Sequence, residues 1–245
     1  MKLLTISSSA AILFAVPATA MEFDFQGAEL SLTGTYGWKP AYTFQTGMLG
    51  SSTEFGLGSG AFLQIDGSVE GFRDDFGFNV IGASVGKHVG FEVAPGTNIG
   101  AFGALDMLKA SMAPTDRSHY MVGLEVAGQV GAVSYDGYGG YLNDFGITNE
   151  YHVAASASYD FTEDWSAGIG GHYADTGFGG TMWQASAKLR YQFMDDFGVE
   201  AKYTYSDRTF SGVDQTVNLT VTKLIGGGTT FESRDYMTRN AGISF

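Results

Sequence analysis

The side chains that could carry out acid–base, nucleophilic or metal chemistry are four histidines, a serine beside one of them, and two pairs of aspartates. The histidines fall in four separate segments without the spacing of metal ligands: His88, His119, His152 and His172. Ser118 and His119 are neighbours in the sequence, which does not give the approach that a nucleophile and its base need, and no third residue supports them. We therefore expect no catalytic residue, no metal and no cofactor.

Two further patterns have simpler explanations than ligand binding. The pairs Asp74–Asp75 and Asp195–Asp196 fall in short polar breaks, where aspartate is common because it hydrogen-bonds the backbone of turns; calcium binding is the weaker alternative. The stretch GLGSG (56–60) is not followed by a helical pattern, so it fails the context test for a phosphate-binding loop. The remaining charged residues are informative through their arrangement.

The segment TMWQASAKLRYQF (181–193) interleaves an apolar and a polar series. Every second residue from Trp183 to Phe193 is apolar, with aromatic rings at both ends and small aliphatic residues in the middle. The residues between them are mostly polar and include Lys188 and Arg190. Successive side chains of a β-strand point to opposite faces, so this segment predicts a strand with one apolar and one polar face. A soluble β-sandwich and a membrane barrel both remain open at this point.

Composition indicates an all-β protein. The chain of 245 residues has 36 glycines, 14% aromatic residues and four prolines. Outside the first 20 residues, proline occurs only where we place loops or turns, as a continuous hydrogen-bonded sheet requires. Helical periodicity does not persist anywhere, and cysteine is absent, so disulfides do not stabilise the fold.

The first 20 residues have the pattern of a cleaved signal peptide. MKLLTISSSAAILFAVPATA combines Lys2, a short apolar run and small residues at 18–20, which predicts a mature chain that begins near residue 21; a retained anchor is the alternative. No later apolar run reaches the roughly 18 residues of a transmembrane helix. The net charge of −13 becomes −14 when Lys2 is removed, which argues against nucleic acid or an anionic membrane surface as a partner.

The alternating pattern predicts twelve strands over residues 21–225. They are 28–36, 61–70, 76–85, 88–94, 99–108, 119–129, 132–142, 150–161, 165–174, 181–193, 197–206 and 215–225. Tight turns are expected at 71–75, 95–98, 130–131, 162–164 and 194–196. Longer loops are expected at 37–60, 109–118, 143–149, 175–180 and 207–214; the short link at 86–87 breaks the alternation. Turns at one end and loops at the other favour an up-and-down antiparallel barrel in an outer membrane over a Greek-key sandwich.

Aromatic residues support the membrane barrel because they mark the ends of the predicted strands. Trp183 and Tyr191 are eight residues apart, roughly 26 Å along a strand and roughly 20 Å along the barrel axis after tilt. That spacing approaches the apolar band of about 25 Å between two aromatic girdles. The residues expected at the lipid interfaces are Tyr151, Tyr159, Phe161, Trp165, Trp183, Tyr191, Phe193 and Tyr203.

The opposite face of the strands would then line the lumen. The residues expected there, as determinants of selectivity, are Glu29, Asp66, Glu70, Glu125, Lys188, Arg190, Glu200 and Lys202. Separate acidic and basic walls would impose a transverse field on a passing solute, and the net acidity favours cations. The alternative is that these charges pair across a narrow, plugged interior, since twelve strands enclose less than a 16-stranded porin. The loop 37–60 either folds inward as a constriction or stays at the surface.

The end of the chain carries a resemblance to small porin-like outer-membrane β-barrel proteins of Gram-negative bacteria. In these, a last strand runs into a Gly-Thr-Thr-Phe…Arg tail; here the matching residues are Gly228, Thr229, Thr230, Phe231 and Arg234. GAELSL (27–32) and NIGAFGAL (98–105) are also similar, and Phe245 departs from the pattern. The resemblance implies a barrel that closes at residue 225, so that 226–245 is a tail; the alternative is that this region contains a terminal strand.

From these observations we expect an outer-membrane barrel that lets small hydrophilic solutes or ions diffuse passively through its lumen. Its partners would be outer-membrane lipid, the barrel-assembly machinery during insertion after export through the periplasm, and the solutes themselves, with homo-oligomers left open. Two rivals are a plugged structural or adhesive barrel that acts through its loops, and a lipid-acting barrel enzyme with Ser118 and His119 at one rim.

Overall fold

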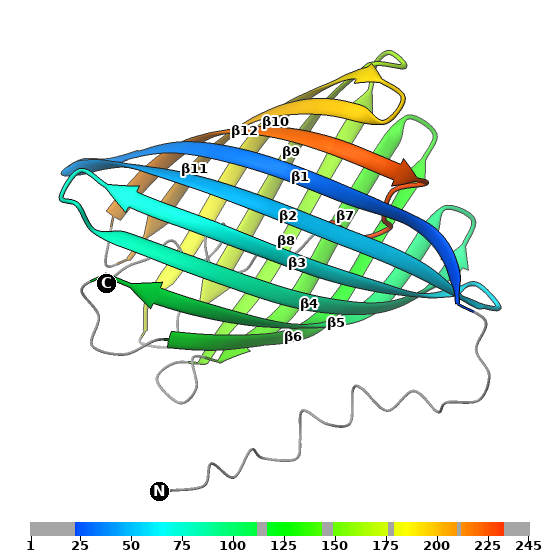
Figure 1. The fold of residues 1–245 in the computed structure, drawn as a ribbon, viewed down its shortest axis with the longest axis horizontal. Helices are drawn as coiled ribbons and strands as arrows, with labels where there is room; N and C mark the ends of the chain where they lie inside the picture. The colour runs from blue at the N-terminus through cyan, green and yellow to red at the C-terminus, as the bar shows by residue number, and fades with distance from the viewer. Residues whose placement is uncertain (1–22, 112–116, 144–148, 176–178, 210–211, 233–245) are drawn as a thin grey trace, which may run out of the picture.

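The chain forms a closed antiparallel β-barrel in a computed structural model that describes residues 23–111, 117–143, 149–175, 179–209 and 212–232 (Figure 1). The strands are β1 (Asp24–Lys39), β2 (Tyr42–Gly58), β3 (Ala61–Asp74), β4 (Asn79–Ala94), β5 (Thr97–Ala110), β6 (Arg117–Val130), β7 (Val133–Asn143), β8 (Asn149–Asp160), β9 (Trp165–Asp175), β10 (Thr181–Met194), β11 (Phe197–Arg208) and β12 (Gly212–Gly226). No helix among these residues is long and apolar enough to cross a membrane.

The barrel closes between its first and last strands. Each strand pairs with its neighbours in the sequence, and β1 pairs with β12 from Gly27↔Gly226 to Trp38↔Gln215. Among the described strands no sheet edge is left open, which is what a sheet in lipid requires because lipid cannot hydrogen-bond its backbone. The predicted all-β, twelve-stranded antiparallel barrel is confirmed.

Antiparallel order gives the barrel two distinct ends. The start of β1 and the end of β12 share one end, which we call the turn end; its connections have two to four residues. The connections at the other end, which we call the loop end, have two to six residues. The segment 75–78 belongs to the loop end, so the prediction of a turn-end connection at 71–75 was wrong.

The expected loop at 37–60 was also wrong, because most of it is strand β2. This strand pairs with β1 through a two-residue turn at 40–41 and with β3 along its length. Gly47, Gly50, Ser51 and Ser52 hide its alternation, since small residues on both faces remove the contrast on which the period-2 pattern depends. Residues 42–58 are therefore part of the wall, and no constriction comes from them.

The two short strands predicted at 76–85 and 88–94 are one strand, β4. Gly86 and Lys87 suggested a break, yet they pair in register with Ala104 and Gly103 of β5. The split of β4 and the omission of β2 cancel, which is why the predicted number of strands agrees with the structure. The same correction resolves the short link at 86–87.

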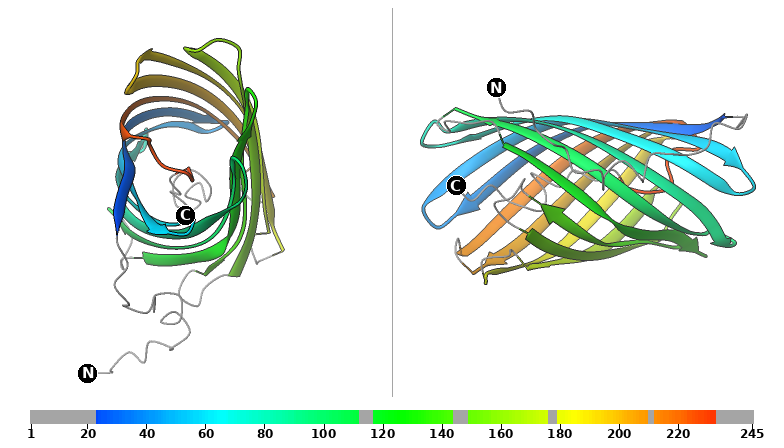
Figure 2. Two further views of the ribbon diagram at one scale, coloured as in Figure 1. Left: turned by 90° about the vertical axis from the view of Figure 1, so that its right-hand side faces the viewer. Right: turned by 90° about the horizontal axis from the view of Figure 1, so that it is seen from below.

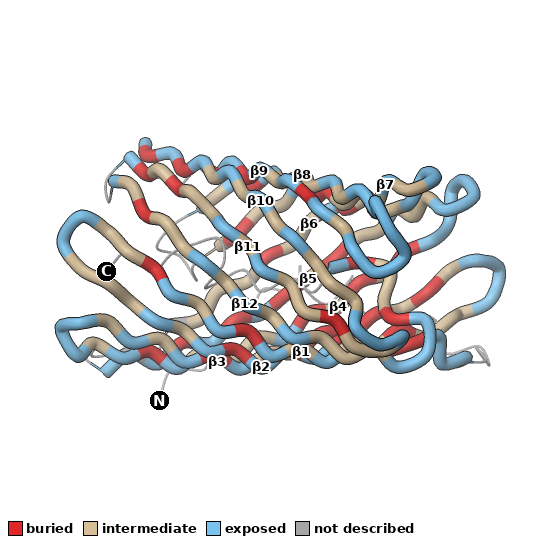
Figure 3. Tube along the Cα trace, turned by 90° about the horizontal axis from the view of Figure 1, so that it is seen from above, coloured by how far each residue is buried: buried red, intermediate tan, exposed pale blue. Residues whose placement is uncertain are grey.

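Burial alternates along the strands, as Figure 3 shows. In β8, Tyr151 and Val153 are more than 60% exposed, whereas His152 between them is 1% exposed. The exposed series carries the apolar residues and the buried series carries the polar ones, the reverse of a water-soluble protein. The barrel therefore presents its apolar face outward and its polar face to the lumen.

Candidate functional site

The lumen holds the charged residues that the sequence singled out. Residues opposite one another in an antiparallel ladder share a face, and the inward series contains buried residues such as Gln64, His88 and Asp106. The structure places all eight predicted charged residues on this series: Glu29, Asp66, Glu70, Glu125, Lys188, Arg190, Glu200 and Lys202. Their effect on selectivity stays a prediction.

A buried acidic network lies on the wall formed by β2–β6. His88 Nε2 lies 2.7 Å from Asp66 Oδ2, and His88 Nδ1 lies 2.7 Å from Glu125 Oε1. Ser52 and Gln64 donate further hydrogen bonds to Asp66 Oδ1. The Asp66, His88 and Glu125 side chains are each at most 3% exposed. Two carboxylates can be buried together here because the imidazole between them contacts both, and its positive charge when protonated offsets theirs.

A basic region lies on the opposite wall, on β10 and β11. Lys188 pairs in register with Lys202, and Arg190 pairs with Glu200. The Lys188 ammonium lies 3.8 Å from Glu200 and 3.2 Å from Glu232. The three predicted cations therefore share one wall, but carboxylates lie among them.

The loop end of this wall carries a further ion pair. Arg208 of β11 lies 3.4 Å from Asp214 of β12, and both side chains are buried. Their positions are inward, in line with Lys202 along β11.

The segment after β12 turns into the lumen (Figure 2). We call residues 227–232 the inner tail. Thr230 donates to Glu54 from its backbone nitrogen (2.8 Å) and hydroxyl (3.1 Å). Gln64 accepts from the Phe231 backbone nitrogen and donates to its carbonyl, both at 3.0 Å. Phe231 is 1% exposed, so the inner tail occupies the turn end of the lumen.

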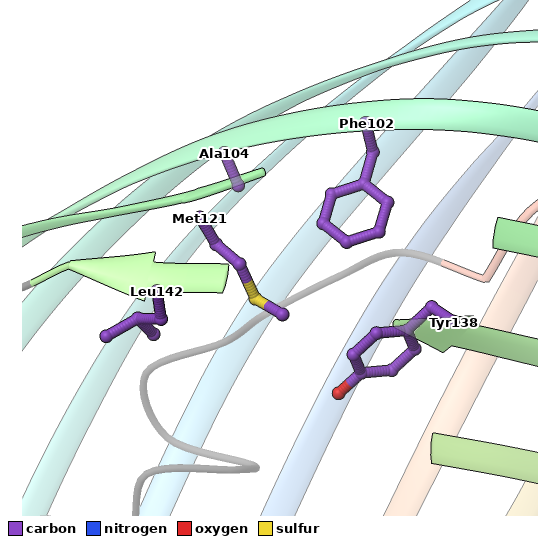
Figure 4. Close-up of a cluster of buried hydrophobic side chains, with 5 residues drawn as sticks. All are labelled: Phe102, Ala104, Met121, Tyr138 and Leu142. Carbon is purple, nitrogen blue, oxygen red and sulfur yellow. The ribbon is translucent and has the colours of Figure 1, made fainter. Parts of the chain in front are cut away.

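An apolar cluster covers part of the wall between β5 and β7 (Figure 4). Its members are buried and point inward from three adjacent strands: Phe102, Ala104, Met121, Tyr138 and Leu142. The lumen is therefore narrowed by side chains on this side as well as by the inner tail.

Open space remains toward the loop end. A cavity of about 180 Å³ is lined mainly by hydroxyl, amide and charged side chains, among them Thr204, Gln184, Lys202 and Glu70, with rings such as Tyr138 beside them. Glu232 of the inner tail borders this cavity. Among the described residues, the inner tail therefore occupies the turn end of the lumen, and the cavity lies on its loop-end side.

Two of the four histidines meet on the lumen side of the hairpin β8–β9. His152 and His172 stack with ring centroids 5.2 Å apart, and His152 Nδ1 lies 3.1 Å from His172 Nε2. Glu150 and Gln184 contact the outer nitrogens of the pair. No group of three metal-binding side chains occurs among the described residues.

The residues weighed for catalysis are not brought together. His119 faces the lumen opposite Asp106, whereas Ser118 lies on the outward series opposite Met107. In the acidic network, Ser52 bonds to Asp66 and not to the histidine, which is the wrong order for activation of a nucleophile by a base. The turn aspartate Asp74 accepts hydrogen bonds from the backbone nitrogens of Phe76 and Phe78, whereas Asp196 pairs with Lys223 at 3.0 Å.

Asp75 of the turn between β3 and β4 lies outside the strands. It accepts hydrogen bonds from the Thr43 hydroxyl (2.6 Å) and backbone nitrogen (2.8 Å). These bonds stabilise the carboxylate and lower the pKa of Asp75 below its ordinary value.

The eight predicted interface aromatics all lie on the outside of the wall or at its turn-end rim. They are Tyr151, Tyr159, Phe161, Trp165, Trp183, Tyr191, Phe193 and Tyr203. Trp165 stacks on Tyr191 near the turn end, with centroids 4.6 Å apart, and Trp183 packs on Tyr205 near the loop end, at 5.3 Å. Their role in anchoring the barrel to lipid stays a prediction.

The inward residues that escaped sequence reasoning include Glu54, His88, Arg208 and Glu232. Glu54 lies on the missed strand β2, and Arg208 lies just past the predicted end of a strand. His88 was judged as an isolated ligand, although its parity with Gln64 and Phe102 assigns it to the lumen. Nothing in the sequence pattern places Glu232, because the inner tail is not a strand.

Solved outer-membrane barrels share this fold. An outer-membrane channel from Pseudomonas putida F1 superposes with a TM-score of 0.62 at 11% identity, over 85% of this chain and 99% of that one. The NanC porin gives 0.55 at 11% identity over 79% and 98%. The KdgM porin in complex with disordered oligogalacturonate gives 0.54 at 11% over 80% and 98%. No protein-family model and no curated protein matches the sequence. The likeness therefore establishes an outer-membrane-type barrel.

Proposed function

We propose that this protein is an outer-membrane pore through which small hydrophilic solutes or ions diffuse. The observation that carries the proposal is the inverted barrel: an apolar exterior around a lumen whose wall is lined by hydroxyl, amide and charged groups next to a cavity. The fold likeness to channels and porins supports it, as does the complex of the KdgM porin with a hydrophilic oligosaccharide. Export would depend on residues 1–20, which lie outside the described residues, and insertion on the barrel-assembly machinery.

The arrangement of charge supports a selective pore. Carboxylates cluster on the β2–β6 wall, whereas Lys188, Arg190 and Lys202 lie on the β10–β11 wall. A solute between them would experience a transverse field, which orients dipolar molecules. The net charge of −13, or −14 without the signal peptide, favours cations over anions.

Single-channel recording in planar bilayers tests the proposal. Steady conductance steps and a reversal potential that shows cation preference under a salt gradient are expected. Arg190→Glu, on the inward face, should raise the cation preference. Lys223→Glu makes the same change of charge at the exposed rim beside Asp196 and should leave selectivity unchanged. Silence in all variants, or equal shifts in both, contradicts a pore lined by Arg190.

The plugged barrel is the second candidate because the inner tail fills the turn end. Phe231 is buried there, and Glu232 reaches Lys188 on the far wall. A barrel closed in this way would act through its loop end, as a structural or adhesive protein. Recordings that stay silent in the wild type and in variants with a displaced inner tail would favour this candidate.

A further inference from the structure

We propose that residues 227–232 are a tethered plug, held in a peptide-binding cleft of the lumen wall from which the segment can leave without unfolding the barrel. The inference rests on the proposed pore for its functional consequence. The binding of the inner tail itself stands on the contacts below, so the two proposals can fail separately.

The cleft has a socket shaped for one aromatic ring. Phe231 packs on Phe62, with centroids 5.4 Å apart, and stacks on His88 at 5.8 Å and 23°. Gly90 of β4 and Gly100 of β5 form the rest of the socket, since a Cβ on either one would lie 2.8 Å from the Phe231 ring. Glycine at both positions leaves the volume that the ring fills.

Polar contacts hold the segment on both sides of the ring. Glu54 accepts two hydrogen bonds from Thr230, and Gln64 bonds both polar groups of the Phe231 backbone. Glu232 then crosses to Lys188 on the other wall at 3.2 Å. The cleft therefore recognises a peptide segment that carries an aromatic residue followed by a carboxylate.

The connection to β12 is that of a hinged segment. Gly226 and Gly228 have φ values of 67° and 77°, a conformation that glycine adopts at little cost. Gly227 at the start of the inner tail donates a backbone hydrogen bond to the Gln26 carbonyl of β1 (3.1 Å), and the tail joins none of the strand ladders of the described residues. Release of residues 228–232 therefore breaks their contacts with wall side chains and leaves the twelve-stranded wall intact. The contacts of the inner tail link it to the β2–β5 wall and to β10, across the path that a solute would take.

Two single variants release the plug from opposite sides. Phe231→Ala removes the ring and should shift the binding equilibrium about a hundredfold or more toward the released state. Gly100→Ala fills the socket instead. Both should lengthen open dwell times and raise conductance in planar bilayers. Gly86→Ala is the matched control, since its Cβ would make only an ordinary contact with Asp66 at 3.5 Å.

A peptide added in trans separates a binding cleft from a general loosening of the barrel. The blocked peptide Gly-Gly-Thr-Thr-Phe-Glu, which repeats residues 227–232, should close the Phe231→Ala channel again, because that variant keeps the socket. It should not close the Gly100→Ala channel. Millimolar peptide is required, since a short tether supplies an effective concentration of that order. A peptide of the same composition in another order should have no effect.

Binding of the inner tail in its cleft can also be measured without recording conductance. The chain has no cysteine, so Thr230→Cys introduces a single thiol, and a bulky maleimide should modify it slowly. The same thiol combined with Phe231→Ala should react as fast as Thr162→Cys, which lies in an exposed turn at the same end.

The outcomes decide both proposals. Equal labelling of Thr230→Cys and Thr162→Cys in the otherwise native chain overturns the plug. When the native chain conducts, a conductance in Phe231→Ala and Gly100→Ala that equals that of the native chain also overturns the plug, as does peptide closure of both variants alike. Protected Thr230→Cys together with silence in every variant leaves the bound plug in place and overturns the pore.

Discussion

The acidic network makes a strong prediction about the stability of the barrel. In His88→Leu, the side chain between Asp66 and Glu125 becomes apolar and about as large. Both carboxylates then lose an ionic contact of 2.7 Å at side chains that are 3% and 0% exposed. Asp66 keeps its hydrogen bonds from Ser52 and Gln64, so the change removes the central charge and leaves that part of the network in place.

The expected loss follows from the asymmetry of buried ion pairs. Removal of one partner from such a pair costs about 3–5 kcal/mol, because the remaining charge is left in a poorly solvated place. His152→Leu is the matched control: His152 is equally buried, but its neighbours are His172 and the more accessible Glu150. It loses hydrogen bonds worth about 1 kcal/mol each. The loss of unfolding free energy in His88→Leu is therefore best judged against the loss in His152→Leu.

Reversible unfolding by urea from phospholipid vesicles measures both losses. The three tryptophans report on the wall, since Trp38, Trp165 and Trp183 all lie on its outward series. A loss below about 1 kcal/mol for His88→Leu, or one equal to that of His152→Leu, would refute a dry ionic network. Addition of Asp66→Asn and Glu125→Gln to His88→Leu should restore part of the stability, because the uncompensated charges are then gone.

Two further predictions test the outer face and the rim. Ile169 is 71% exposed and lies midway between Trp165 and Tyr173 in β9, so Ile169→Lys should lower the free energy of unfolding in lipid by about 2–4 kcal/mol. Ser156→Lys, on the lumen face opposite Asp136, should lower it little, and equal losses would contradict the assigned faces. Because the pKa of Asp75 is lowered in the folded state, its carboxylate stabilises the rim at pH values above the ordinary aspartate pKa. This stabilisation is lost as the pH falls through the lowered pKa of the folded state. The unfolding curves of Asp75→Asn and of the native chain should therefore differ at neutral pH and converge in acid.

Strand parity could be predicted well wherever the two faces differ in chemistry. In β8 and β10, aromatic ends, small aliphatic centres and polar alternates left one assignment, and the structure agrees. In β2 the same reasoning failed, because glycine, serine and threonine occur on both faces and carry no contrast. That strand is specified instead by its pairing with β1 and β3, which is information held by the neighbours.

The contacts inside the lumen were less accessible to sequence reasoning. Parity assigns His88 to the inner face, but its meeting with Asp66 and Glu125 depends on the stagger of β3, β4, β5 and β6 around the barrel. The sequence suggested that the chain end after residue 225 is a tail, and gave no sign that Glu232 would reach Lys188. Contacts between side chains across the lumen form only when the sheet closes into a barrel, and no local sequence pattern specifies that closure.

Closure also explains why the two halves of the lumen differ. A narrow barrel leaves an interior that side chains can nearly fill, and this chain fills the turn end with Phe62, Phe231 and the acidic network, where each charge has a partner. Toward the loop end, short hydroxyl side chains such as Thr33, Thr204 and Thr216 lie among the larger ones, and a cavity remains between them. Since large side chains at the turn end come partly from the inner tail, the degree of filling there depends on a segment outside the sheet. Under the two proposals made above, release of residues 227–232 would therefore change the permeability of the barrel while its twelve-stranded wall stays the same.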